Sequence, residues 1–123
     1  MVLLDFWATW CGPCLIELPN VVANYRKYHE RGFEILGVSL DKAESIPGLA
    51  NFTKTNNMPW KQICDGKLWQ SEVAVSYGVS GIPFMLLVDG DTAEILGSEL
   101  EVRAGNLGPA IEAGLARKKP PPK

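Results

Sequence analysis

Two cysteines that could carry out redox chemistry, Cys11 and Cys14, stand two residues apart in the run WCGPC at positions 10–14. Cysteines at this spacing are typical of a pair that alternates between dithiol and disulfide, or of one half of a zinc site. A structural zinc site needs four ligands, and only Cys64 and His29 remain as further Cys or His candidates. We interpret the pair as a redox centre, with the zinc half-site and an inert structural disulfide as the alternatives.

The segments on either side place this pair at the start of a helix. Residues 2–8 form a continuous apolar run typical of a buried strand, and apolar residues recur at helical spacing over 13–29. The positive end of a helix dipole stabilises a thiolate. We therefore expect Cys11 to be the nucleophile and Cys14, one turn later and less exposed, to resolve the mixed disulfide. Pro13 fits the first turn because no backbone N–H is needed there.

The hydrophobic pattern also predicts the elements that must position the cysteines. Further strands are expected over 33–40, 60–64, 84–88 and 93–97, and further helices over 46–56, over 69–77 and from about Pro109. The first helix joins two buried strands, a crossover that makes them parallel. The run DGDT at 89–92 is a hairpin signal that makes the last two strands antiparallel. The sequence thus predicts one α/β domain with a mixed sheet flanked by helices.

Composition narrows the class of protein and of partner. The chain has 123 residues and is 46% hydrophobic, which is typical of a globular domain. Its net charge of −2 gives no overall positive electrostatic potential that would attract nucleic acid. No apolar run reaches the roughly 20 residues that span a bilayer, and no signal peptide is evident. We predict a domain over 1–115 and a basic, proline-rich tail over 116–123. Because residues 2–8 already form a strand, we expect the natural protein to begin earlier.

Three other residues need a physical explanation. Asp5 interrupts the buried strand, where a carboxylate is costly unless its pKa rises or it finds a hydrogen-bonding partner. Pro83 opens a strand, which is unusual unless the preceding peptide is cis or the strand lies at an edge. Cys64 follows the apolar Ile63 at a strand end, which favours a buried, inert thiol over a third redox partner.

Residues 5–14, followed by Pro19, resemble the active-site segment of thioredoxins. The runs CLIELP at 14–19 and YGVSGIP at 77–83 are similar to the TlpA/ResA branch of bacterial thioredoxin-like proteins, which is related to AhpC/TSA proteins. The resemblance covers nearly the whole chain. It implies a thioredoxin fold with a strand and a helix inserted before a cis-proline, within residues 41–81. The branch also carries an N-terminal β-hairpin that this chain lacks.

The resemblance implies roles for single residues. Thioredoxins carry an acid at the position of Asp5 that exchanges protons with Cys14. The TlpA branch uses an acid at the position of Glu17, although an exposed glutamate favoured by the helix dipole is an equal alternative. Pro83 would be the cis-proline, leaving the Ile82 backbone free to pair with an extended substrate segment.

The expected substrate-contacting surface consists of Trp10, Gly12, Pro13, Ile82 and Pro83. Trp7 is expected to pack beneath the site, and Trp10 to be partly exposed. Phe84 departs from the threonine that the family often has after the proline, which leaves substrate preference open.

The leading functional interpretation is an enzyme that reduces disulfides in other proteins. It would draw electrons from an upstream redox donor and need no bound small-molecule cofactor and no metal. Gly12 and Pro13 favour the reducing direction by resemblance. A thiol peroxidase is one alternative, and a metal or copper domain that binds through the CxxC pair, with Met58 or Met85 nearby, is another. Resemblance alone implies a bacterial extracytoplasmic place, in the periplasm or tethered to a membrane through the missing N-terminal part, with the cytoplasm as the alternative.

Overall fold

The computed structural model describes residues 1–117, which form a single five-stranded mixed sheet in the order β3-β2-β1-β4-β5. The strands are β1 (Val2–Trp7), β2 (Glu34–Ser39), β3 (Lys61–Ile63), β4 (Phe84–Val88) and β5 (Ile95–Ser98). Strands β1, β2 and β3 run parallel, whereas β4 is antiparallel to β1 and to β5. The strand that leads to Cys11, β1, is therefore central and buried, as the apolar run over residues 2–8 indicates.

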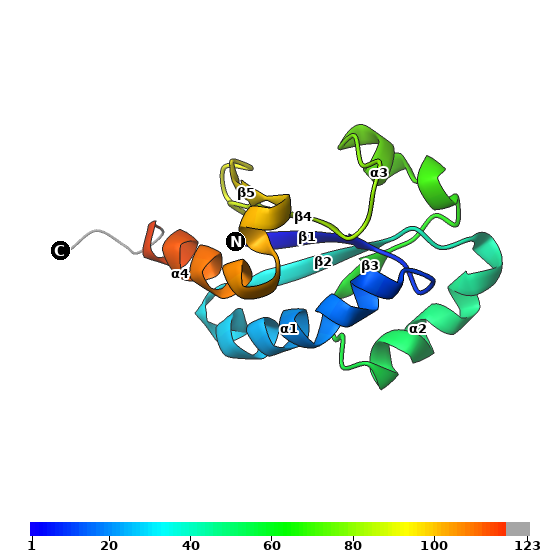
Figure 1. Cartoon of the computed structure of the whole chain (residues 1–123), viewed down its shortest axis with the longest axis horizontal. Helices are drawn as coiled ribbons and strands as arrows, with labels where there is room; N and C mark the ends of the chain where they lie inside the picture. The colour runs from blue at the N-terminus through cyan, green and yellow to red at the C-terminus, as the bar shows by residue number, and fades with distance from the viewer. Residues whose placement is uncertain (118–123) are drawn as a thin grey trace.

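Four α-helices cover the sheet. They are α1 (Gly12–Tyr28), α2 (Ile46–Thr55), α3 (Glu72–Ser76) and α4 (Leu107–Arg117). Figure 1 shows α1 and α2 on one side of the sheet and α3 on the other. Ring contacts agree with this arrangement, because Trp7 packs on Phe52 of α2 while Phe6 packs on Tyr77 at the end of α3. Since side chains alternate along a strand, Asp5 lies on the same face as Trp7, towards α1.

The fold confirms the thioredoxin-type architecture and the insertion expected before Pro83. Helix α2 and strand β3 both lie within residues 41–81, and β3 extends the sheet beyond β2. The core is built from side chains of the sheet and of the helices. Its fully buried members include Leu3, Phe6, Val38, Leu40, Leu87, Val102, Leu107 and Ile111.

One predicted helix start was confirmed and another was wrong. The last helix begins at the fully buried Leu107, directly after a 3₁₀ turn (Ala104–Asn106), so Pro109 lies in its first turn as expected. Pro109 is tolerated there because the first turn needs no backbone N–H. The helix expected over 69–77 is split into a 3₁₀ turn (Leu68–Gln70) and α3, because the Ser71 hydroxyl accepts a hydrogen bond from the Ala74 N–H and caps a new helix.

The C-terminal end of α4 can be compared with the tail predicted over residues 116–123. Helix α4 continues to Arg117, so residues 116 and 117 are helical, and residues 118–123 of that tail lie outside the described range. The division at residue 115 stays a prediction. Within residues 1–117, no helix combines the length and the apolar character that crossing a membrane requires.

Candidate active site

The two cysteines form a disulfide at the start of α1. Cys11 is the N-cap residue, and its sulfur accepts a hydrogen bond from the Cys14 N–H at 3.2 Å. This contact is the predicted one between the first sulfur and the free N–H groups of a helix start. Gly12 and Pro13 between the cysteines are exposed. The end of the strand and the proline-containing first turn therefore position the redox pair.

The expected difference in burial between the two cysteines is wrong for this disulfide form. Cys11 is 4% exposed and Cys14 is 7% exposed, so Cys14 is not the less exposed of the two. A bond between the sulfurs holds both side chains against the start of α1. The predicted roles of nucleophile and resolving cysteine concern the dithiol form and stay predictions.

A buried carboxylate that sequence reasoning missed supports the loop before Cys11. Asp41 accepts hydrogen bonds from the Thr9 N–H and, at 2.6 Å, from the Thr9 hydroxyl, and the Ser39 hydroxyl also donates to it. Asp41 is only 1% exposed. Its place two residues after strand β2, at the same sheet edge as the end of β1, is the signal that could have revealed it.

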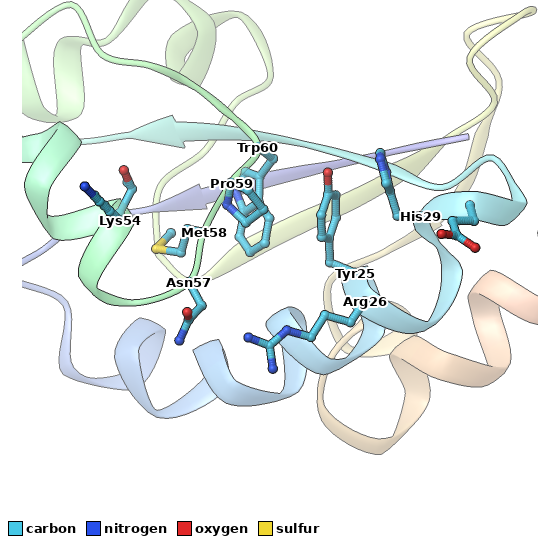
Figure 2. Close-up of a pocket in the computed structure, with 10 residues that line it drawn as sticks. Tyr25, Arg26, His29, Lys54, Asn57, Met58, Pro59 and Trp60 are labelled. Atoms are coloured by element: carbon cyan, nitrogen blue, oxygen red, sulfur yellow. The ribbon is translucent and has the colours of Figure 1, made fainter.

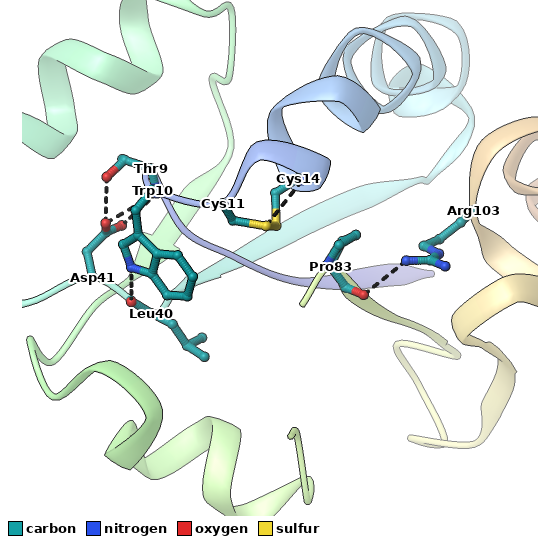
Figure 3. Close-up of a disulfide and its surroundings, with 8 residues drawn as sticks. All are labelled: Thr9, Trp10, Cys11, Cys14, Leu40, Asp41, Pro83 and Arg103. Atoms are coloured by element: carbon teal, nitrogen blue, oxygen red, sulfur yellow. Dashed lines mark hydrogen bonds between the residues drawn. A yellow bond between two sulfur atoms is a disulfide. The ribbon is translucent and has the colours of Figure 1, made fainter. Parts of the chain in front are cut away.

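Trp10 lies beside the disulfide with its ring held in place. Its Nε1 donates to the Leu40 carbonyl at 2.9 Å, yet the residue remains 50% exposed, which confirms the expected partly exposed surface. Trp69, from the inserted segment, packs on it with ring centroids 5.9 Å apart. Beneath them Trp7 is 2% exposed and donates to Gln62 Oε1 at 2.8 Å, confirming its packing role. Figure 3 shows the disulfide between Trp10 and Pro83 in that view.

Asp5 is buried on the sheet face covered by α1, the helix that carries Cys14. Burial, and secondarily the negative charge of Glu17, raise its pKa from 3.8 to about 7. Its Oδ1 has no hydrogen-bonding partner within residues 1–117. A carboxyl group with this pKa can both accept and release a proton near neutral pH.

Glu17 is half-buried rather than freely exposed, and it binds a distant segment. Its Oε1 accepts a hydrogen bond from the Ala104 N–H at 2.5 Å and another from the Asn20 side-chain amide at 3.3 Å. The structure therefore places the two predicted acids close enough for the negative charge of Glu17 to add to the effect of burial on the pKa of Asp5.

The Ile82–Pro83 peptide is cis, as the sequence suggested. Within residues 1–117, the backbone N–H and C=O of Ile82 make no hydrogen bond. Ile82, Pro83 and Phe84 line a pocket of about 390 Å³ together with Gly78 and Glu99. The Arg103 guanidinium donates to the Pro83 carbonyl at 3.2 Å (Figure 3).

Cys64, Met58 and Met85 are the candidates for further redox or metal chemistry that the sequence offers. Cys64 is half-buried, not fully buried as expected, with its sulfur 3.9 Å from the Asp41 carbonyl oxygen. Met58 and Met85 are both buried in the core. Within residues 1–117, no group of three or more His, Cys, Asp or Glu side chains could hold a metal ion.

A pocket of about 610 Å³ lies near the other end of α1 (Figure 2). Its aromatic wall is formed by Tyr25 and Trp60, whose ring centroids are 5.0 Å apart, with Arg26 and Lys54 also among its lining residues. None of the predicted site residues lines it.

The fold and the CxxC disulfide define a thioredoxin-fold protein with a dithiol–disulfide centre. The family model described as the AhpC/TSA family matches residues 1–96, and the chain belongs to this family. It is 37% identical over 90 residues to thiol-disulfide oxidoreductase ResA of Bacillus thuringiensis, covering 73% of this chain and 49% of ResA. It is 32% identical over 105 residues to tryparedoxin of Trypanosoma brucei brucei, covering 83% of this chain and 69% of tryparedoxin.

Solved structures agree with this placement. The thioredoxin domain of a thiol-disulfide oxidoreductase from Bacteroides vulgatus is 31% identical with a TM-score of 0.78, covering 93% of this chain and 78% of that domain. The C-terminal domain of a putative thiol-disulfide oxidoreductase from Bacteroides thetaiotaomicron is 28% identical with a TM-score of 0.81, and the match covers 94% of this chain and 77% of that domain. The predicted kinship with ResA-like thiol-disulfide oxidoreductases is confirmed. The chain spans about half the length of the ResA relatives it matches.

Proposed function

We propose that this domain reduces disulfide bonds in other proteins through the Cys11/Cys14 pair. The observation that carries the proposal is the disulfide at the N-terminus of α1, flanked by the half-exposed Trp10 and by the unbonded Ile82 backbone. The names of the relatives support the reaction class. The reducing direction of the reaction, the protein substrates and the upstream electron donor are part of the proposal.

The reaction begins with the dithiol form. The Cys11 thiolate attacks one sulfur of the substrate disulfide, the substrate S–S bond breaks, and one substrate cysteine leaves as a thiolate that takes up a proton. A mixed disulfide now joins Cys11 to the other substrate cysteine. The helix N-terminus favours the Cys11 thiolate in this step because its N–H groups and dipole stabilise negative charge.

The second step closes the disulfide seen in the structure. Asp5 accepts the Cys14 proton, and the Cys14 thiolate attacks the Cys11 sulfur, releasing the second substrate thiolate. The two electrons that reduce the substrate come from the dithiol, which becomes the Cys11–Cys14 disulfide. An upstream dithiol then returns the pair to its reduced form. The pKa of Asp5, raised to about 7, suits this proton transfer near neutral pH.

Substrate binding in this proposal uses the surface on both sides of the disulfide. Trp10, Gly12 and Pro13 lie on one side, and Ile82 and Pro83 on the other. A substrate segment in extended conformation would pair with the free N–H and C=O groups of Ile82. We infer an extracytoplasmic location in a bacterium from the resemblance to ResA, with any membrane tether lying outside this sequence.

The reduction potential of the Cys11/Cys14 couple tests the proposed direction. The purified domain is equilibrated with dithiothreitol or glutathione buffers, and tryptophan fluorescence reports the redox state because Trp10 lies beside the disulfide. A potential near the roughly −270 mV of thioredoxin supports a reductase. A potential near the roughly −120 mV of DsbA overturns the reducing direction. Rapid consumption of hydrogen peroxide by the dithiol form would instead favour the thiol peroxidase alternative.

A further inference from the structure

The segment between β5 and α4, residues 99–106, connects the two sides of the redox site. Two fully buried side chains, Val102 and Leu107, anchor it in the core. Between them, the Ala104 N–H donates to Glu17 at 2.5 Å, and the Ala104 carbonyl accepts from the Asn20 side-chain amide at 2.9 Å. Both backbone polar groups of Ala104 are therefore bound to α1, the helix that begins at the disulfide.

The neighbouring residue, Arg103, reaches the other side of the site. Its guanidinium donates to the Pro83 carbonyl at 3.2 Å. Strand β4 pairs with β5 only from Leu86 onwards, so the sheet offers the Pro83 carbonyl no strand partner on that side. The Arg103 guanidinium supplies the hydrogen-bond donor that a neighbouring strand would otherwise provide. Within residues 1–117 no carboxylate lies within 4.0 Å of the half-buried Arg103, so its contact is with the backbone and not with an acid.

The backbone next to Arg103 supports a functional reason for this arrangement. Ala104 has a φ of 49°, in the left-handed region that favours glycine. Backbone strain of this kind is found at functional sites, where the surrounding contacts hold it in place. At Ala104 those contacts are the hydrogen bonds to Glu17 and Asn20, and the side chain of the adjacent Arg103 donates to the Pro83 carbonyl.

We propose that Arg103 is a positioning residue, which holds the Ile82–Pro83 segment at a fixed place relative to the disulfide. The inference rests on the proposed reduction of protein disulfides. A hydrogen bond from a charged donor is stronger than one between neutral groups. By fixing the peptide that follows Ile82, Arg103 keeps the free N–H and C=O groups of Ile82 ordered before a substrate segment arrives. Less conformational freedom is then lost on binding.

Arg103→Met tests this role, because methionine keeps much of the side-chain length and removes every donor. With insulin as the disulfide substrate and dithiothreitol as the reductant, we expect KM to rise about tenfold, as for the loss of one charge-assisted hydrogen bond, with kcat unchanged. Bis(2-hydroxyethyl) disulfide has no peptide groups that could pair with the Ile82 backbone, so its rate of reduction should stay within about twofold of the unmodified domain, as should the redox equilibrium constant of the cysteine pair.

Arg103→Lys keeps one charged donor and should recover part of the lost affinity for insulin. Arg26→Met, on the exposed surface of α1, is the matched control and should leave every quantity unchanged. An unchanged KM for insulin in Arg103→Met overturns the proposal. An equal loss towards insulin and bis(2-hydroxyethyl) disulfide, or a shifted redox equilibrium, also overturns it, because Arg103 would then act on the cysteines themselves. If the unmodified domain fails to reduce insulin, the proposed function fails and not the role of Arg103 alone.

Discussion

Replacement of Asp5 by asparagine should stabilise the oxidised protein in a pH-dependent way. The pKa of Asp5 is raised from 3.8 to about 7, chiefly because burial disfavours the charged form. The folded state therefore holds a proton that the unfolded state has released between about pH 4 and pH 7. The stability contributed by this group is present below pH 4, falls as the pH rises through that window, and stays low above pH 7.

The size of the effect follows from the two pKa values. At about 1.36 kcal/mol per pH unit, the interval from 3.8 to about 7 corresponds to about 4 kcal/mol at pH 8. Asparagine is neutral at every pH, so its gain over aspartate should be about 4 kcal/mol larger at pH 8 than at pH 4. Urea unfolding of both oxidised proteins at the two pH values measures this difference directly. Any cost of fitting the amide is the same at both pH values and cancels.

Asp65→Asn is a useful control because its sign is opposite. Hydrogen bonds from backbone N–H groups, that of Glu72 first, lower the pKa of Asp65, so its removal should lose stability at pH 8 relative to pH 4. A gain for Asp5→Asn that is equal at pH 4 and pH 8 would refute the argument, because it would mean that Asp5 carries no extra proton in the folded state.

The same substitution should slow the chemistry while it stabilises the fold. Asparagine cannot accept the Cys14 proton, so release of the substrate from the mixed disulfide should slow, and more than it does in Glu17→Gln. Stopped-flow measurement of substrate release in both variants makes this comparison. An unchanged rate in Asp5→Asn contradicts the role of Asp5 as proton acceptor.

Three further predictions follow from the geometry of the site. Cys14→Ser should accumulate a mixed disulfide between Cys11 and a protein substrate, visible by non-reducing electrophoresis; absence of the adduct would contradict the assignment of Cys11 as nucleophile. Asp41→Asn should lower the free energy of unfolding by about 1–3 kcal/mol, measured by urea titration, because an amide cannot accept from Thr9 and Ser39 together as the carboxylate does. Trp69→Ala should lower it by about 1 kcal/mol through the lost ring contact with Trp10, and a loss of several kcal/mol would show that Trp69 belongs to the core.

The features that could be predicted from the sequence are those that depend on local spacing. The helix start at Cys11, the central strand with its buried Asp5, and the hairpin after β4 each follow from neighbouring residues. The burial of the cysteines was not predictable in this way, because it depends on whether the sulfurs are joined. The start of α3 was missed because the side-chain cap of Ser71 determined it.

Contacts between distant segments depend on the topology of the sheet and not on local spacing. Asp41 meets Thr9 only because β1 and β2 are parallel and end at the same edge of the sheet. Arg103 meets Pro83 only because the chain returns from β5 across the end of β4. No local pattern marks either pair, since 32 and 20 residues separate their members.

These distant contacts connect the proton chemistry of the site to its geometry. Burial raises the pKa of Asp5, the charge of the Glu17 carboxylate raises it further, and the same carboxylate binds the Ala104 N–H. Ala104 in turn precedes the buried anchor at Leu107 and follows the Arg103 that holds Pro83. A shift of this segment would therefore change two things at once, the place of the Ile82 backbone and the charge that Asp5 experiences. In the proposed mechanism, the carboxylate that accepts the Cys14 proton and the backbone offered to the substrate thus depend on one set of hydrogen bonds.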